Sequence, residues 1–166
     1  MALDREIIFD ALFKRLSAVP GLRTAARKFK PLASIAVSDM PAMFMMKGGE
    51  TAKPRRGLPP VWLLEVDLLV YIQHQDGPNS PGPSTELNNI ISGIEAALEM
   101  TPQELAAMDA DPTIPDDVYR EIKANSYGTT LGGLCSHCFI SGTIQTDEGS
   151  LSDQAAAAIP IEILTL

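Results

Sequence analysis

The residues with the most recognisable chemical spacing are Cys135-Ser136-His137-Cys138, a C-x-x-C motif that encloses a histidine. Such a motif can be a redox centre or half of a zinc site. A closed zinc site needs four ligands, and the chain has no second C-x-x-C motif and only one further histidine, His74. In a strand over residues 134–145, an offset of three residues would place Cys135 and Cys138 on opposite faces. The spacing therefore favours two ordinary half-buried cysteines over a metal or redox site.

Glu65 and Asp67 are the other pair with a spacing that could support catalysis. They lie two residues apart in an expected strand, so both carboxylates share a face, as general acid–base pairs can. The same pattern fits a sheet face that meets a partner. The glycine-rich segment 128–133 lacks the G-K-[ST] ending of a phosphate-binding loop, and no G-x-S-x-G elbow is present. We therefore expect no enzyme activity, no cofactor and no metal.

Residues 47–60 concentrate positive charge in an acidic chain. The 166 residues hold 13 Lys and Arg against 21 Asp and Glu, for a net charge of −8. This balance argues against a protein that coats nucleic acid, and also against an anionic membrane surface as partner. Glycine and proline predict that the segment is a surface loop or the tip of a long hairpin. It is either simply solvated or docks on an acidic partner surface, through Lys47, Lys53, Arg55 and Arg56.

The strand expected over residues 61–73 has two unequal faces. Its even-numbered residues, from Trp62 to Ile72, are all apolar and predict a face buried in the core. The odd-numbered face is partly polar but too apolar for plain solvent. A neighbouring subunit could cover this second face, which includes Glu65, Asp67, Leu69 and Tyr71.

The remaining periodicity predicts a single domain over residues 1–166. Amphipathic helices are expected over residues 4–18 and 85–99, and Thr101 and Glu104 form a capping box for a short helix to about Ala107.

Short extended pieces are expected over 25–29 and 42–46, and longer strands over 134–145 and 156–164. Pro160 places the last strand at an edge or in a bulge. Residues 100–130 read as a polar insertion, with helical turns around 117–123. This order predicts an α+β fold, an antiparallel sheet with helices on one face.

The N-terminus has no signal-peptide pattern, and no apolar run approaches the ~20 residues of a membrane-spanning helix. We expect a protein made in a cytoplasm and without a membrane partner.

Several segments, taken in order, resemble the tail terminator (tail completion) proteins of long-tailed bacteriophages. The first is the opening REIIFDALFKRLSAVPGL, which is followed by Pro41-Ala42-Met43-Phe44. Next come a W-x-L-x-V-x-L-x-V-Y strand from Trp62 to Tyr71 and the helix LNNIISGIEAAL. The last is TLGGLCSHCFISGTIQTDEGSLSDQAAAAIPIEI. The resemblance covers most of the chain, although residues 100–128 have no counterpart.

The resemblance implies an α+β sandwich that assembles as a ring, typically a hexamer, on the head-proximal end of the tail tube. Such a ring ends tube polymerisation and joins the tail to the head. Its partners are further copies of itself, the tail tube protein and the head–neck connector, and DNA passes through its lumen without specific binding. The expected location is the virion tail, after synthesis in the cytoplasm of a host bacterium.

The family has no catalysis, no cofactor and no short motif from which site residues could be transferred. Two alternatives remain open. One is another head–tail connector or tail-tube ring protein, and the other is a small metal or redox module that uses Cys135 and Cys138.

Overall fold

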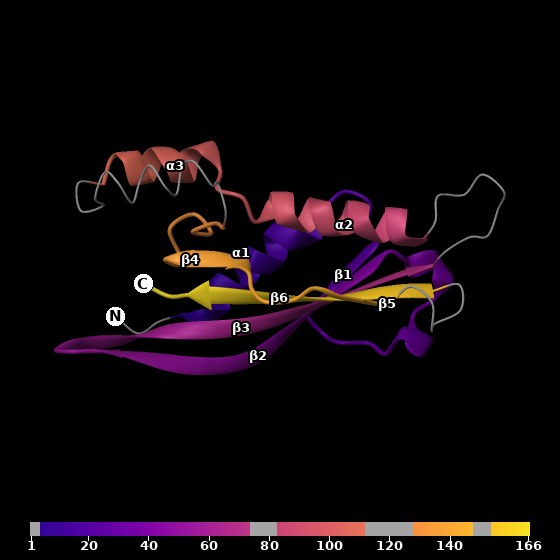
Figure 1. The fold of residues 1–166 in the computed structure, drawn as a ribbon, viewed down its shortest axis with the longest axis horizontal. Helices are drawn as coiled ribbons and strands as arrows, with labels where there is room; N and C mark the ends of the chain where they lie inside the picture. Colours follow the sequence, from indigo (N-terminus) through magenta and orange to yellow (C-terminus); the bar gives the residue numbers. More distant parts are fainter. Residues whose placement is uncertain (1–3, 74–82, 112–127, 148–153) are drawn as a thin grey trace.

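The computed structural model describes residues 4–73, 83–111, 128–147 and 154–166, and it has the expected α+β fold. A curled sheet carries the helices on one side (Figure 1). The helices are α1 (Arg5–Ser17), α2 (Pro83–Ala97) and α3 (Pro102–Asp109). The strands are β1 (Thr24–Ala26), β2 (Ala42–Arg55), β3 (Leu58–Gln73), β4 (His137–Ile140), β5 (Gln145–Asp147) and β6 (Gln154–Leu164).

The sheet has the order β1-β2-β3-β6-β4, and β5 also pairs with β6. All of these pairs are antiparallel, as expected, except that β1 pairs with β2 in parallel. The exception arises because residues 27–41 cross from β1 to β2 through two single-turn 3-10 helices, Leu32–Ser34 and Val37–Asp39, instead of a tight turn. The expected extended piece over 25–29 is therefore only the short strand β1.

The segment 47–60 is a hairpin, one of the two forms that the sequence left open. β2 runs without a loop to Arg55, and β3 begins at Leu58. The turn between them includes Gly57 at φ 73°, a conformation that a side chain rarely adopts. The hairpin extends beyond the body of the molecule, at the left of Figure 1.

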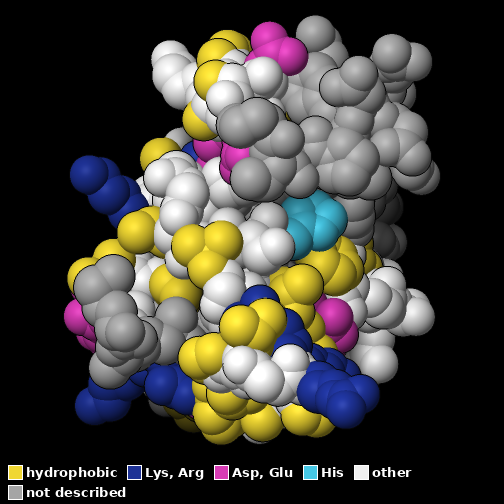
Figure 2. Space-filling view, turned by 90° about the vertical axis from the view of Figure 1, so that its left-hand side faces the viewer, with side chains coloured by type: hydrophobic (Ala, Val, Ile, Leu, Met, Phe, Trp, Pro, Cys, Tyr) yellow, Lys and Arg dark blue, Asp and Glu magenta, His cyan; other side chains and the backbone are white. Residues whose placement is uncertain are grey.

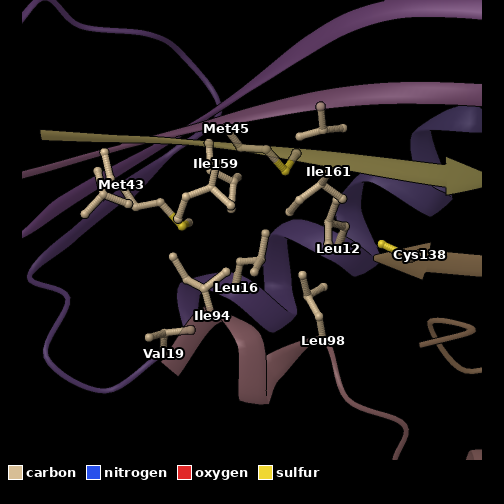
Figure 3. Close-up of a cluster of buried hydrophobic side chains, with 14 of the residues drawn as sticks. Leu12, Leu16, Val19, Met43, Met45, Ile94, Leu98, Cys138, Ile159 and Ile161 are labelled. Carbon is tan, nitrogen blue, oxygen red and sulfur yellow. The ribbon is translucent and has the colours of Figure 1, made fainter. Parts of the chain in front are cut away.

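The main core lies between the sheet and helices α1 and α2. The even-numbered β3 residues from Leu64 to Ile72 are buried, and Val66 and Leu68 pair with Ile161 and Ile159 of β6. Trp62, which was predicted on the same buried face, is half-buried. Leu12 and Leu16 of α1 and Ile94 of α2 pack on this face, together with Met43 and Met45 of β2 (Figure 3). Gly93 lets α2 approach the segment that follows α1, because a Cβ atom there would lie 2.7 Å from a methyl carbon of Val19.

The helix boundaries follow local signals and match the expectation. The Asp4 side chain caps α1 by accepting hydrogen bonds from the backbone N–H groups of Glu6 and Ile7. The capping box of α3 forms as predicted, with reciprocal bonds between Thr101 and Glu104. The helical turns expected around 117–123, and most of the polar insertion after α3, lie outside the described residues. None of the described helices is long and apolar enough to cross a membrane.

The end of the chain differs from the expectation in two ways. The single strand expected over 134–145 is two short strands, β4 and β5, with a break that includes Gly142 at φ 76°. Of the two positions expected for Pro160, the edge is wrong, because β6 lies between β3 on one side and β4 and β5 on the other. The expected bulge is also not seen against β3, because the register of these two strands runs through Pro160 without a shift. The carbonyl of Pro160 accepts a hydrogen bond from Ser141, within that break. The missing N–H of the proline therefore faces the gap between β4 and β5, where no strand needs it.

Candidate assembly surface

The second face of the sheet points away from α1 and α2, and the described residues cover only part of it. Ile35 and Met40, from the crossover between β1 and β2, form a small separate core with Phe44 and Tyr71. The rings of Phe44 and Tyr71 lie 5.9 Å apart, and burial raises the pKa of the Tyr71 hydroxyl. Leu69 packs against the same cluster. This half of the predicted subunit-interface face is therefore filled by the chain's own crossover, which the strand pattern alone could not reveal.

The other half of this face is acidic and open. Glu65 and Asp67 of β3 share it, as predicted, and both are exposed. The register places Glu162 of β6, which is half-buried, directly opposite Glu65. One oxygen of Glu65 accepts a hydrogen bond from the Gly49 backbone N–H at 3.2 Å. We call Glu65, Asp67 and Glu162 the acidic face.

The hairpin of β2 and β3 is anchored at its base by helix α1. The Lys47 ammonium lies 3.1 Å from a Glu6 oxygen and 4.3 Å from the ring centroid of Phe9. Arg5 pairs with Glu50 at 2.7 Å and lies over the ring of Trp62. Lys47, predicted as part of a docking loop, is therefore a strand residue that holds the hairpin to the body. Its contact with Glu6 joins residues 41 positions apart, a pairing that no local pattern predicts.

Beyond this anchor, every residue of the hairpin from 48 to 60 is exposed. Three of the four predicted docking residues lie there: Lys53, Arg55 and Arg56. Leu58 beside them has 61% of its surface exposed. Figure 2, which views this end of the molecule, shows Lys and Arg side chains next to exposed hydrophobic ones. We call Lys53, Arg55 and Arg56 the basic tip.

A buried carboxylate that the sequence did not single out for function joins α3 to the segment before β4. Glu104 has 5% of its surface exposed. Its Oε1 atom accepts hydrogen bonds from the Thr129 hydroxyl at 2.6 Å and the Gly132 N–H at 2.8 Å. The N–H and hydroxyl groups of Thr130 donate to the same oxygen, and Arg15 lies 3.5 Å away. We call this arrangement the Glu104 knot.

The electrostatics of the Glu104 knot favour the ionised carboxylate. Burial on its own would raise the pKa of Glu104, but the N–H groups of Gly132 and Thr101 and the hydroxyls of Thr129 and Thr130 outweigh it and lower this pKa to about 2. An ionised carboxylate with so many donors is a poor proton carrier near neutral pH. The knot therefore stabilises the fold and offers no general acid or base.

Cys135 and Cys138 are both buried in the main core, with 1% and 0% of their surfaces exposed. Their expected placement on opposite faces of one strand is wrong, because β4 begins only at His137 and Cys135 precedes it. Burial raises the pKa of Cys135 to about 12 and also raises the pKa of Cys138. Neutral thiols suit packing and disfavour metal binding or redox attack, which need thiolates. Across the four described ranges, no three His, Cys, Asp or Glu side chains are grouped to hold a metal ion.

Comparisons with known proteins return no match, either to a protein-family model or to a curated protein. The function of the chain is therefore inferred from the geometry of its own surfaces. Two of these surfaces, the basic tip and the acidic face, carry opposite charge and are left uncovered by the described part of the chain. Such surfaces are suited to contacts with other macromolecules.

Proposed function

We propose that this chain is the tail terminator of a long-tailed bacteriophage. In this role it forms a ring, expected to be a hexamer, on the head-proximal end of the tail tube. The ring ends tube polymerisation and presents a surface to the head–neck connector. One observation carries the proposal most strongly: a hairpin held at its base by α1 projects from a body whose sheet is only partly covered on its second face by the described residues.

The uncovered surfaces fit the needs of a ring subunit. A ring subunit needs two different side surfaces, because a head-to-tail contact joins unlike patches on neighbouring copies. The acidic face and the exposed hairpin are two unlike patches on one chain. Their mixed polar and apolar character is typical of surfaces that become buried in an assembly.

The charge of the chain agrees with a ring through which DNA moves. A net charge of −8 repels phosphate, so acidic side chains on a ring lumen would let DNA pass without binding it. The proposed role needs no catalysis and no cofactor. The fully hydrogen-bonded Glu104 and the neutral, buried Cys135 and Cys138 are consistent with that role.

The proposal is tested by deleting the gene from the phage that encodes it and measuring tails by negative-stain electron microscopy. We expect abnormally long tails that lack heads, and normal lengths and joined heads when the wild-type gene is supplied in trans. Normal, head-joined tails without the gene would contradict the proposal. Purified protein that polymerises into long tubes would instead indicate a tail-tube protein.

A further inference from the structure

We propose that copies of this chain join head to tail, with the basic tip of one copy seated on the acidic face of the next. The partner of the hairpin is thus a second copy of the chain. The inference rests on the proposed ring and names the two surfaces that would form it.

The first support is a separation of charge along the chain. Residues 1–60 hold eleven of the 13 basic side chains but only five of the 21 acidic ones. Four of the other eight basic residues in this range, Arg5, Arg15, Arg27 and Lys47, pair with acids. None of the ion pairs among the described residues includes the basic tip. The tip is therefore a cluster of three exposed cations with no acidic partner among the described residues, and its one hydrogen bond, from Arg55 Nε to the Pro59 carbonyl at 3.0 Å, leaves the charge unpaired.

The second support is that one copy cannot neutralise its own two surfaces. Lys53 pairs in register with Val61 on the same strand pair that carries Glu65 and Asp67. Four to six residues of β3 separate these positions, which corresponds to about 13–20 Å at the rise of a β-strand. A salt bridge requires N and O atoms within about 4 Å, and two side chains cannot span the ~20 Å between Lys53 and Asp67, so these two residues can meet only between copies.

The third support is an electrostatic cost inside the acidic face. Glu65 and Glu162 are direct cross-strand partners, and like charges in that position destabilise a sheet. The described residues provide no ion pair for Asp67 or Glu162. A lysine or arginine from another copy would remove the repulsion, and that relief adds to the attraction between the surfaces.

Apolar side chains accompany the charges on both surfaces. Leu58 projects from the hairpin with 61% exposure, and Leu63 and Leu164 form a half-buried cross-strand pair next to the acidic face. Packing of Leu58 against this pair would bury apolar area beneath the salt bridges. Because the two surfaces differ, the contact is heterologous and repeats from copy to copy until it closes a ring.

The contact is tested first by disulfide trapping in a Lys53→Cys, Asp67→Cys double variant. The Cα atoms of a disulfide lie within about 7 Å, so these positions cannot bridge within one chain. Mild oxidation of the concentrated protein should produce a ladder of cross-linked multimers on a non-reducing gel. Each single variant is a matched control and should give no ladder, because Cys135 and Cys138 are buried. A double variant that stays monomeric would overturn the inference.

A charge swap tests the same contact without a cross-link. One half-swap places glutamate at Lys53, Arg55 and Arg56, and the other places lysine at Asp67 and Glu162. Sedimentation velocity should show self-association weakened at least about tenfold in each half-swap, with recovery when both are combined on one chain. Circular dichroism verifies that the variants fold. A folded combined variant that does not recover association would contradict head-to-tail docking.

These tests separate the inference from the proposed function. A cross-linked ladder together with normal tails in the gene deletion would leave the contact in place and remove the terminator role. Long tails in the gene deletion, without a cross-linked ladder in the double variant, would support the terminator role and remove the proposed contact.

Discussion

Glu104 and Glu162 are residues of the same type in two opposite environments. The Glu104 carboxylate is buried and surrounded by donors from α3 and from the segment before β4. Glu162 lies on an open sheet face, directly opposite another glutamate. All of the Glu104 donors come from its own chain, whereas no cation among the described residues pairs with Glu162. The comparison separates the part of the molecule that stabilises the fold from the part available for assembly.

The largest effect is expected from a Glu104→Ala substitution. It would leave the hydroxyl of Thr129 and the N–H of Gly132 buried without their acceptor, so the free energy of unfolding should fall by about 3 kcal/mol. Urea unfolding followed by circular dichroism measures this change. The matched control is Glu95→Ala on the exposed side of α2, which should change stability by no more than about 0.5 kcal/mol. Equal effects of the two substitutions would show that the knot contributes nothing.

A smaller change in the free energy of unfolding is expected when low pH protonates Glu104 in the same knot. The folded pKa of Glu104, about 2, lies below the value of about 4.3 for an unfolded glutamate. The stabilisation is therefore fully present above the unfolded pKa and is lost as the pH falls from about 4.3 through 2. A Glu104→Gln variant should be less stable than wild type by about 2 kcal/mol at pH 7, with a gap that closes toward pH 2.

Urea titrations of both proteins at pH 7, 4 and 3 measure this gap. Taking the difference cancels the contributions of other acids, including Glu6, whose pKa Arg27 and Lys47 also lower to about 2. A gap that stays constant with pH would contradict the assignment to Glu104.

The smallest expected change in the free energy of unfolding is an increase, and it should come from Glu162→Gln. Glu162→Gln removes one of two facing charges, so a single copy should gain up to about 0.5 kcal/mol of stability at low salt. The gain should fade in high salt, which screens exposed charges. Thermal unfolding of dilute protein at two salt concentrations measures it. A loss of stability as large as that of Glu104→Gln would remove the distinction between the two environments.

Local patterns predicted the elements well wherever neighbouring residues decide the structure. The helical stripe of residues 4–18, the capping box at Thr101 and the alternation of β3 all appear as expected. Predictions failed where a distant segment decides. Pro160 lies in an interior strand because its neighbour is split into β4 and β5, and nothing near Pro160 in the sequence indicates that split.

For the candidate surfaces too, the features set by neighbouring residues were predicted, and those set by distant contacts were not. The shared face of Glu65 and Asp67 follows from the two-residue period of a strand. The separation of Lys47 from the basic tip does not, because it depends on a contact with Glu6 in α1. The Glu104 knot was also missed, since its donors at Thr129, Thr130 and Gly132 lie 25–28 residues away.

By itself, the sequence determined which side chains share a face, because strand and helix periods act over a few bonds. It also determined the excess of acidic charge and its separation from the basic segment 47–60. Only the tertiary structure decided which faces remain open. The crossover covers Tyr71, helix α1 engages Lys47, and the segment before β4 encloses Glu104. Each of these results depends on burial by residues far away in the chain, where contacts form only after the elements have packed.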